Sequence, residues 1–295
     1  MNAKLKKLFQ QKVNGKTILI TGASSGIGLT VAHSLAKAGA HVLLLARSKD
    51  TLEEVKAEIE AQGGKASVFP CDLNDMESID KVSQQILKEI PQIDILINNA
   101  GRSIRRAVHE SVDRFHDFER TMQLNYFGAV RLVLNLLPHM IARKDGQIIN
   151  ISSIGVLANA TRFSAYVASK AALDAFSRCL SAEVHSHKIA ITSIYMPLVR
   201  TPMIAPTKIY NYVPTLSPEE AADLIAYAIV KRPKKVATNL GRLASITYAI
   251  APDINNVLMS IGFNLFPSST ASVGEQEKLN LIQRAYARLF PGEHW

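Results

Sequence analysis

Short apolar runs alternate with amphipathic segments along most of the chain. Six runs are mostly apolar: residues 17–20, 41–45, 66–69, 93–97, 147–151 and 189–195. Runs of this length are typical of parallel strands that are buried on both faces. The segment that ends at Ala38 and the segments 52–62 and 76–90 instead repeat apolar residues with helical spacing. The alternation predicts an α/β fold, a Rossmann-type doubly wound parallel sheet with helices on both faces.

No linker rich in Pro, Gly or Ser divides the 295 residues, so we expect a single domain. Its parts are a basic N-terminal segment (1–14), a nucleotide-binding domain (15–240) and a C-terminal extension (241–295). Residues 277–290 of the extension have the pattern of an amphipathic helix. We expect the extension to pack on the domain. Two roles of the extension remain open: it could add to the core packing, or it could form a lid that faces the substrate or a membrane surface.

The first apolar run leads into Thr21-Gly22-Ala23-Ser24-Ser25-Gly26-Ile27-Gly28 and then into a helical segment. Glycines let the backbone bend tightly and approach a pyrophosphate, and a helix N-terminus offers free N–H groups and the positive end of a dipole. A glycine-rich turn between a strand and a helix is the context that a dinucleotide site requires. We predict cofactor contacts from Gly22, Ser24, Ser25, Gly26, Ile27 and Gly28.

The turns after the next strands favour NADPH or NADP as the cofactor. Arg47 follows the second strand, where an NAD-binding chain would carry an acidic residue, and a guanidinium there can pair with a 2′-phosphate. The alternative is a solvated arginine that begins a loop. Asp72 and Leu73 follow the third strand, at the expected place of the adenine. Asn99 follows the fourth strand, beside the expected ribose, although simple turn chemistry would also account for these residues.

Ser153, Tyr166 and Lys170 have the pattern of an active site. Tyr166 and Lys170 are four residues apart, so on a helix they share one face, and the ammonium is expected to lower the pKa of the phenol. A free tyrosine has a pKa of about 10, and an acid or base works best near the working pH. Ser153 follows the fifth run, so its hydroxyl is expected at the carboxyl end of a strand, where open α/β sheets bind ligands.

These motifs resemble, in their order, the short-chain dehydrogenase/reductase family: Thr-Gly-x-x-x-Gly-x-Gly, Asn98-Asn99-Ala100-Gly101, Ser153 and Tyr-x-x-x-Lys. The resemblance covers about residues 15–240. It implies a fourth catalytic residue, Asn125, inside a long helix, and it implies that Tyr166 and Lys170 also hold the cofactor. It further implies that Thr201 contacts the nicotinamide, and Leu198 stands where the family usually has glycine. A homo-oligomer, dimer or tetramer, is expected through the helices around Asn125 and Tyr166.

Within the family, the chain resembles the bacterial aldehyde-forming fatty acyl-CoA reductases over nearly its whole length. That resemblance implies NADPH-dependent reduction of a long-chain fatty acyl-CoA to a fatty aldehyde, with release of CoA, in the lipid metabolism that supplies wax esters. Basic residues at 102, 105, 106 and 231–235 are candidate contacts for the CoA phosphates, with solvated surface as the alternative. An oxidoreductase of ketones, 3-oxoacyl groups or secondary alcohols remains open, and so does a non-catalytic NADP-binding sensor or scaffold.

Composition and charge argue against several other classes of function. Apolar residues make up 47% of the chain and charged residues 20%, as in a soluble domain with a sizeable core. The net charge of +9 comes without interleaved aromatic residues, so we expect no nucleic-acid binding. Cys71 and Cys179 are expected to be buried free thiols, and no metal site is expected. The chain begins without a signal-peptide pattern and has no membrane-spanning stretch, so a cytoplasmic protein is expected, with peripheral membrane contact left open.

Overall fold

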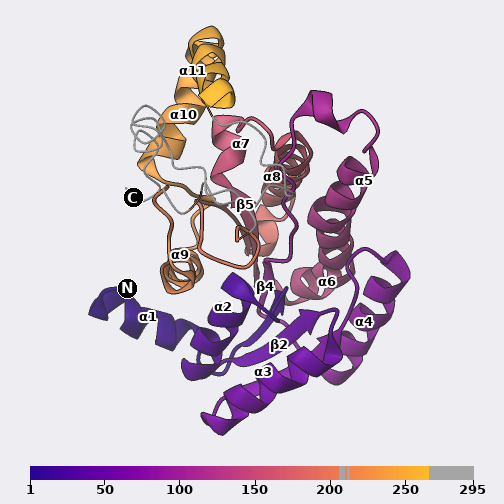
Figure 1. Cartoon of the computed structure of the whole chain (residues 1–295). Helices are drawn as coiled ribbons and strands as arrows, with labels where there is room; N and C mark the ends of the chain where they lie inside the picture. The colour runs from indigo at the N-terminus through magenta and orange to yellow at the C-terminus, as the bar shows by residue number, and fades with distance from the viewer. Residues whose placement is uncertain (206–209, 211–212, 266–295) are drawn as a thin grey trace.

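A seven-stranded parallel sheet forms the centre of the molecule, in the order β3-β2-β1-β4-β5-β6-β7 (Figure 1). The structure is a computed structural model that describes residues 1–205, 210 and 213–265. The strands are β1 (Thr17–Thr21), β2 (His41–Ala46), β3 (Lys65–Pro70), β4 (Ile95–Asn98), β5 (Gly146–Ser153), β6 (Ile189–Met196) and β7 (Lys235–Val236). The predicted Rossmann-type fold is confirmed, and β7 is the strand that the apolar runs did not indicate.

Helices cover both faces of the sheet. Over one face lie α1 (Ala3–Val13), α2 (Gly26–Lys37), α3 (Lys49–Ala61) and α9 (Pro218–Lys231), and over the other lie α4 (Met76–Glu89), α6 (Ala129–Arg143) and α8 (Ser164–Glu183). Alternate residues of a strand point to opposite faces, so Ile18 and Ile20 of β1 pack into one core and Leu19 into the other. Both cores are continuous from strand to strand, which explains the uninterrupted apolar runs.

The basic N-terminal segment packs against the domain as α1. Phe9 is 4% exposed and Val13 is fully buried, and the helix lies against α9. Its lysines, among them Lys4 and Lys7, are exposed. The segment therefore contributes an apolar face to the core and a charged face to the solvent.

The long helix predicted around Asn125 is not α-helical throughout. After the short 3₁₀ turn η1 (Val108–Ser111) come α5 (His116–Met122), the π-helical turn η2 (Gln123–Gly128) and α6 in succession. π-helical turns occur often at functional sites. The prediction that both cysteines are buried is wrong for Cys179, which is exposed on α8, because the helical period that turns Leu180 into the core turns its neighbour outward.

The remaining helices are α7 (Ile154–Ala158), η3 (His185–His187), which precedes β6, α10 (Asn239–Ile250) and α11 (Pro252–Leu265). α9 begins with a capping box, in which Ser217 Oγ accepts from the Glu220 N–H at 3.2 Å. α10 packs against α7 and α11 against α10. Among the helices that the structure describes, none is long and apolar enough to cross a bilayer. The amphipathic helix expected at 277–290 lies outside the described residues.

Candidate active site

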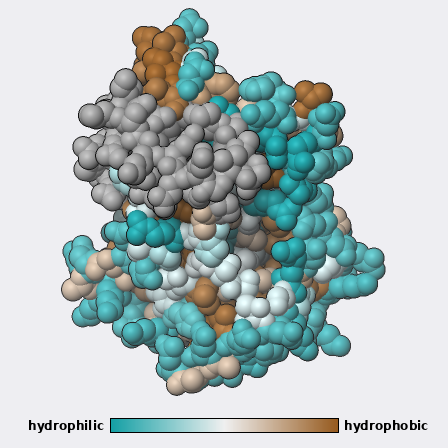
Figure 2. All heavy atoms as spheres, viewed as in Figure 1, coloured by the Kyte–Doolittle hydropathy of each residue, from teal (hydrophilic) through white to brown (hydrophobic). Residues whose placement is uncertain are grey.

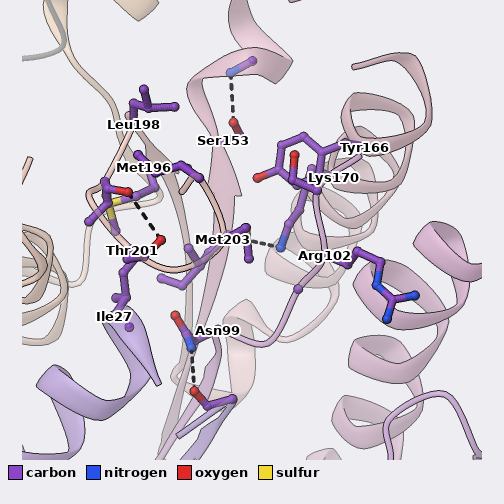
Figure 3. A pocket seen from close by; sticks show the side chains of 18 of the residues that line it. Ile27, Asn99, Arg102, Ser153, Tyr166, Lys170, Met196, Leu198, Thr201 and Met203 are labelled. Atoms are coloured by element: carbon purple, nitrogen blue, oxygen red, sulfur yellow. Dashed lines mark hydrogen bonds between the residues drawn. The ribbon is translucent and has the colours of Figure 1, made fainter. Parts of the chain in front are cut away.

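The carboxyl ends of the strands border a large cavity of about 1820 Å³. Its walls come from the loops that follow β1 to β6 and from α7, α8 and α10, and Figure 3 shows part of it. Loop backbones and helix N-termini converge at this edge of an open α/β sheet, which is why ligands bind there. Of the predicted site residues, all except Gly28 and Asn125 line the cavity: Gly22, Ser24, Ser25, Gly26, Ile27, Arg47, Asp72, Leu73, Asn99, Ser153, Tyr166, Lys170 and Thr201.

The glycine turn after β1 presents backbone to the cavity. Gly22 and Gly26 have φ of +67° and +54°, a conformation that residues with side chains rarely adopt. Ser25 precedes α2 and its side chain makes no capping hydrogen bond, so the first N–H groups of the helix remain available for an anion. Gly28 supports the turn by close packing, since a Cβ there would lie 2.1 Å from Gly22 O and 2.7 Å from Asn99 Nδ2.

The loops after β2 and β3 form one end of the cavity. These strands are paired, so their loops are neighbours, and Arg47 is exposed on the first of them. On the second, Asp72 Oδ1 accepts from the Asn74 N–H at 3.0 Å and from its Nδ2 at 2.7 Å, which fixes the loop beside Leu73. A cation therefore stands at this end of the cavity, in the place after β2 where an acidic residue would disfavour a phosphate.

Asn99 joins the loops after β1 and β4. Its Nδ2 donates to Thr21 O at 2.9 Å, and its N–H donates to Thr21 Oγ1 at 3.0 Å. The Ala100 N–H donates to the same hydroxyl at 2.9 Å. Because β1 and β4 are paired, these bonds fix the floor of the cavity between the glycine turn and the active-site loops. Asn99 thus has a structural role in addition to the cofactor contact predicted for it.

Ser153, Tyr166 and Lys170 converge at the centre of the cavity (Figure 3). Ser153 is the last residue of β5 and caps α7, where its Oγ accepts from the Gly155 N–H at 3.1 Å. That bond uses an acceptor position of the hydroxyl oxygen and leaves its proton available for donation, and the hydroxyl faces Tyr166 (Figure 3). Lys170 follows one turn later on α8, and its Nζ donates to Ile151 O at 2.7 Å.

The electrostatics of this group differ in one respect from the expectation. Burial raises the pKa of Tyr166, and it is the hydrogen bond with Ser153, not Lys170, that partly lowers it. Burial lowers the pKa of Lys170 to about 8, while its ammonium is hydrogen-bonded to the main chain of β5. Tyr166 is accordingly a phenol at neutral pH, in the state required of a proton donor, and Lys170 loses its charge near pH 8.

Asn125 is 1% exposed and lies behind the cavity wall. Its Oδ1 accepts from the Arg102 N–H at 2.8 Å, and its Nδ2 donates to Arg102 O and to Ser169 Oγ, both at 2.9 Å. The side chain thereby connects the loop after β4 to the helix that carries Tyr166 and Lys170. Its catalytic role stays a prediction, and the geometry gives it a positioning role.

The loop after β6 carries Leu198 and Thr201. Leu198 replaces the expected glycine without a left-handed backbone, and its carbonyl accepts from the Leu216 N–H at 2.9 Å. Thr201 faces the glycine turn, since a Cβ on Gly26 would lie 3.2 Å from Thr201 Cγ2. The loop therefore covers the cofactor-binding turn, as the predicted nicotinamide contact requires.

The basic residues fall into two groups. Arg102, Arg105 and Arg106 line the cavity, and Arg106 also pairs with the buried Asp117. Residues 231–235 instead lie near the amino ends of the strands: they lead into β7, and Arg232 pairs with Asp145 just before β5. The prediction that they meet the same ligand is therefore not supported. Sequence reasoning also missed Leu240, Gly241 and Ala244 of α10, which line the cavity although they carry no motif.

Comparisons with known proteins agree with this geometry. A family model for short chain dehydrogenases matches residues 16–209. A protein of Acinetobacter baylyi named fatty acyl-CoA reductase is 83% identical over 295 residues, the whole of both chains. A fatty acyl-CoA reductase of Mycobacterium tuberculosis is 48% identical over 248 residues, 84% of each chain. The crystal structure of an L-sorbose reductase from Gluconobacter frateurii, complexed with NADPH and L-sorbose, is 30% identical with a TM-score of 0.68, covering 76% of this chain and 93% of the other.

Proposed function

This chain belongs to the short chain dehydrogenase family, and from that premise we propose that it reduces long-chain fatty acyl-CoA thioesters to aldehydes with NADPH, releasing CoA. The observation that carries the substrate is the full-length similarity to a relative named fatty acyl-CoA reductase, which includes the extension beyond residue 240. The use of the aldehyde in wax ester formation stays a prediction.

The cavity residues fit NADPH. The α2 N-terminus and the glycine turn offer backbone N–H groups for a pyrophosphate. Arg47 supplies a cation for a 2′-phosphate, Asp72 and Leu73 border the space for an adenine, and Thr201 faces the turn. The NADPH complex of a relative supports the same assignment. When bound, NADPH supplies the hydride that is added to the thioester carbon.

Ser153 and Tyr166 act on the thioester oxygen. The free proton of the Ser153 hydroxyl donates a hydrogen bond to that oxygen, and Tyr166 transfers its phenol proton to it as negative charge develops. Ser153 stabilises the resulting phenolate by its hydrogen bond, and Lys170 is placed to hold the cofactor ribose. The product of this step is a hemithioacetal, held in the cavity by the residues that protonated it.

Collapse of the hemithioacetal completes the reaction. Tyr166 takes the hydroxyl proton back, the carbonyl re-forms as the C–S bond breaks, and the CoA thiolate leaves and takes a proton from the solvent. No enzyme thiol is needed, in contrast to enzymes that transfer the acyl group through a cysteine thiolate. Cys71 borders the cavity beside Asp72, and burial raises the pKa of its thiol, so it is a poor nucleophile there.

The test follows NADPH oxidation with hexadecanoyl-CoA while aldehyde and free thiol are measured in parallel. We expect the three quantities to match, and we expect Tyr166→Phe to abolish them. Tyr227→Phe is the matched control because Tyr227 is 40% exposed on α9, and it should keep full activity. If ketones or 3-oxoacyl substrates oxidise NADPH and acyl-CoA does not, the proposed substrate is wrong. The assignment to the family would still hold.

A homo-oligomer is supported by apolar side chains on the helices around Asn125. Phe127 on η2 and Leu134 on α6 are 49% and 50% exposed. Large exposed apolar side chains on neighbouring helices are common at subunit interfaces. Leu134→Glu should lower the molar mass measured by light scattering after size exclusion. An unchanged molar mass would show that this position of α6 is not part of the subunit interface.

Peripheral membrane contact is supported by the outer faces of α10 and α11. Ile250, Ile254 and Val257 are 79%, 59% and 60% exposed, and Figure 2 shows apolar side chains gathered at this end of the molecule. Such a surface can enter a lipid headgroup region. We expect the full chain to co-sediment with phosphatidylcholine–phosphatidylglycerol vesicles and the variant Ile250→Glu/Val257→Glu to remain in the supernatant. Equal sedimentation of the two proteins would contradict membrane contact through this surface.

A further inference from the structure

Helix α10 has two different faces. Leu240, Gly241 and Ala244 line the cavity, whereas Leu243 and Ile246 are 59% and 55% exposed. Residues four apart lie on one side of a helix, so Leu240 and Ala244 form successive turns of a single inner face. A helix of the C-terminal extension is thus part of the wall of the active-site cavity.

The position of α10 is fixed relative to the catalytic serine. Its N-cap is Thr238, which is fully buried and whose Oγ1 accepts from the Gly241 N–H at 3.0 Å. Gly241 lies directly against α7: a Cβ there would be 3.1 Å from Leu157 Cδ1 and 3.2 Å from Ile154 Cγ1. Because α7 begins immediately after Ser153, this packing fixes the inner face of α10 relative to the catalytic serine.

The two sides of the cavity differ in polarity. In Figure 3, Leu198 and Met196 lie on one side of the Ser153 and Tyr166 pair, and Arg102 lies on the other. The helices on the apolar side add mainly hydrocarbon to the lining: Ile154, Ala158, Leu240 and Ala244. The loop after β4 adds arginines at 102, 105 and 106. This difference in polarity favours one orientation of an amphiphilic thioester, with the acyl chain toward α10 and the phosphates toward the arginines.

We propose that the inner face of α10 forms the far end of the acyl-chain subsite and that Ala244 sets the length of chain that the site accepts. This inference rests on the proposed function. A small side chain at this position leaves room for hydrocarbon, and each methylene buried is worth about fourfold in binding, from about 0.8 kcal/mol per CH₂. Filling the space with a larger side chain should therefore exclude the last methylenes of a long chain and leave a short chain unaffected.

The test compares Ala244→Phe with Ala249→Phe, a matched control on the same helix, since Ala249 is exposed and does not line the cavity. kcat/KM is measured with octanoyl-CoA and hexadecanoyl-CoA, and NADPH affinity is measured separately. We expect Ala244→Phe to lower kcat/KM for hexadecanoyl-CoA at least tenfold while octanoyl-CoA and NADPH affinity change less than twofold. The control should retain the wild-type ratio of the two substrates.

Two variants keep the test decisive if Ala244→Phe does not fold. Ala244→Leu should shift the ratio in the same direction by a smaller factor, and Leu240→Ala should shift it toward longer chains by about fourfold or more. Wild-type reduction of both acyl-CoAs with an unchanged ratio in these variants would overturn this inference and leave the proposed function intact. A wild-type enzyme inert toward both would overturn the proposed function and this inference together.

Discussion

Replacing Lys170 by methionine is expected to stabilise the protein without cofactor while abolishing its reductase activity. Lys170 is 3% exposed, and burial lowers its pKa from 10.5 to about 8. That difference corresponds to about 3 kcal/mol of unfavourable free energy for the buried ammonium at neutral pH. The variant loses the hydrogen bond from Nζ to Ile151 O, which offsets about 1–2 kcal/mol. A net gain of about 1–2 kcal/mol in unfolding free energy is expected at pH 7.

The pH dependence provides the sharper test. Below pH 8 the lysine is protonated in both the folded and the unfolded chain, so its penalty is fully present. Between pH 8 and 10.5 the unfolded chain binds more protons at this group than the folded chain, so wild-type stability rises with pH relative to the variant. The slope of the difference approaches about 1.4 kcal/mol per pH unit. The advantage of Lys170→Met should therefore disappear between about pH 9 and pH 9.5, and the wild type should be the more stable protein at pH 10.

Urea unfolding at pH 7 to 10, monitored by circular dichroism without NADPH, measures the difference. Lys37→Met is the control, because Lys37 is exposed at the end of α2, and its stability should follow that of the wild type at every pH. If wild type and Lys170→Met remain parallel from pH 8 to 10, the ammonium is not penalised by burial and the reasoning fails. A packing defect in Lys170→Met would lower its unfolding free energy by the same amount at every pH. The pH dependence of the difference from wild type would not change.

Other substitutions test the cofactor end and the supporting loops. Gly28→Ala would drive a Cβ against Gly22 O at 2.1 Å, so the glycine turn must shift; we expect at least about 2 kcal/mol lower stability and loss of NADPH binding by fluorescence. Arg47→Ala should weaken NADPH binding about tenfold and leave NADH binding unchanged, which calorimetry would measure; an equal loss for both would remove the 2′-phosphate contact. Asn125→Ala leaves two main-chain groups of Arg102 without partners, so kcat should fall at least tenfold with little change in NADPH affinity, and Asn125→Asp, which keeps one acceptor, should recover part of it. An unaltered kcat in Asn125→Ala would show that the loop does not depend on this residue.

The sequence by itself determined the features that depend on local patterns. Parallel strands buried on both faces must be apolar along their length, so the runs marked six of the seven strands to within about two residues. The glycine turn could be predicted from the sequence because a positive φ, as at Gly22, and close packing, as at Gly28, both require glycine. Tyr166 and Lys170 were predicted to share a face because the helical period alone places them there.

The tertiary structure alone decided the features that join distant segments. Nothing near Lys170 indicated that its ammonium would bond to Ile151 O, or that Ser153 would be the group that lowers the pKa of Tyr166. The basic residues at 102–106 and at 231–235 have the same character in sequence, yet the first group follows the carboxyl end of β4 and the second lies near the amino ends of the strands. The inner face of α10 has the composition of an ordinary helix, and it became a wall of the active site only because Gly241 lets it pack against α7. Local periodicity fixes which residues share an element, whereas the residues that meet in a cavity are fixed by how the elements pack.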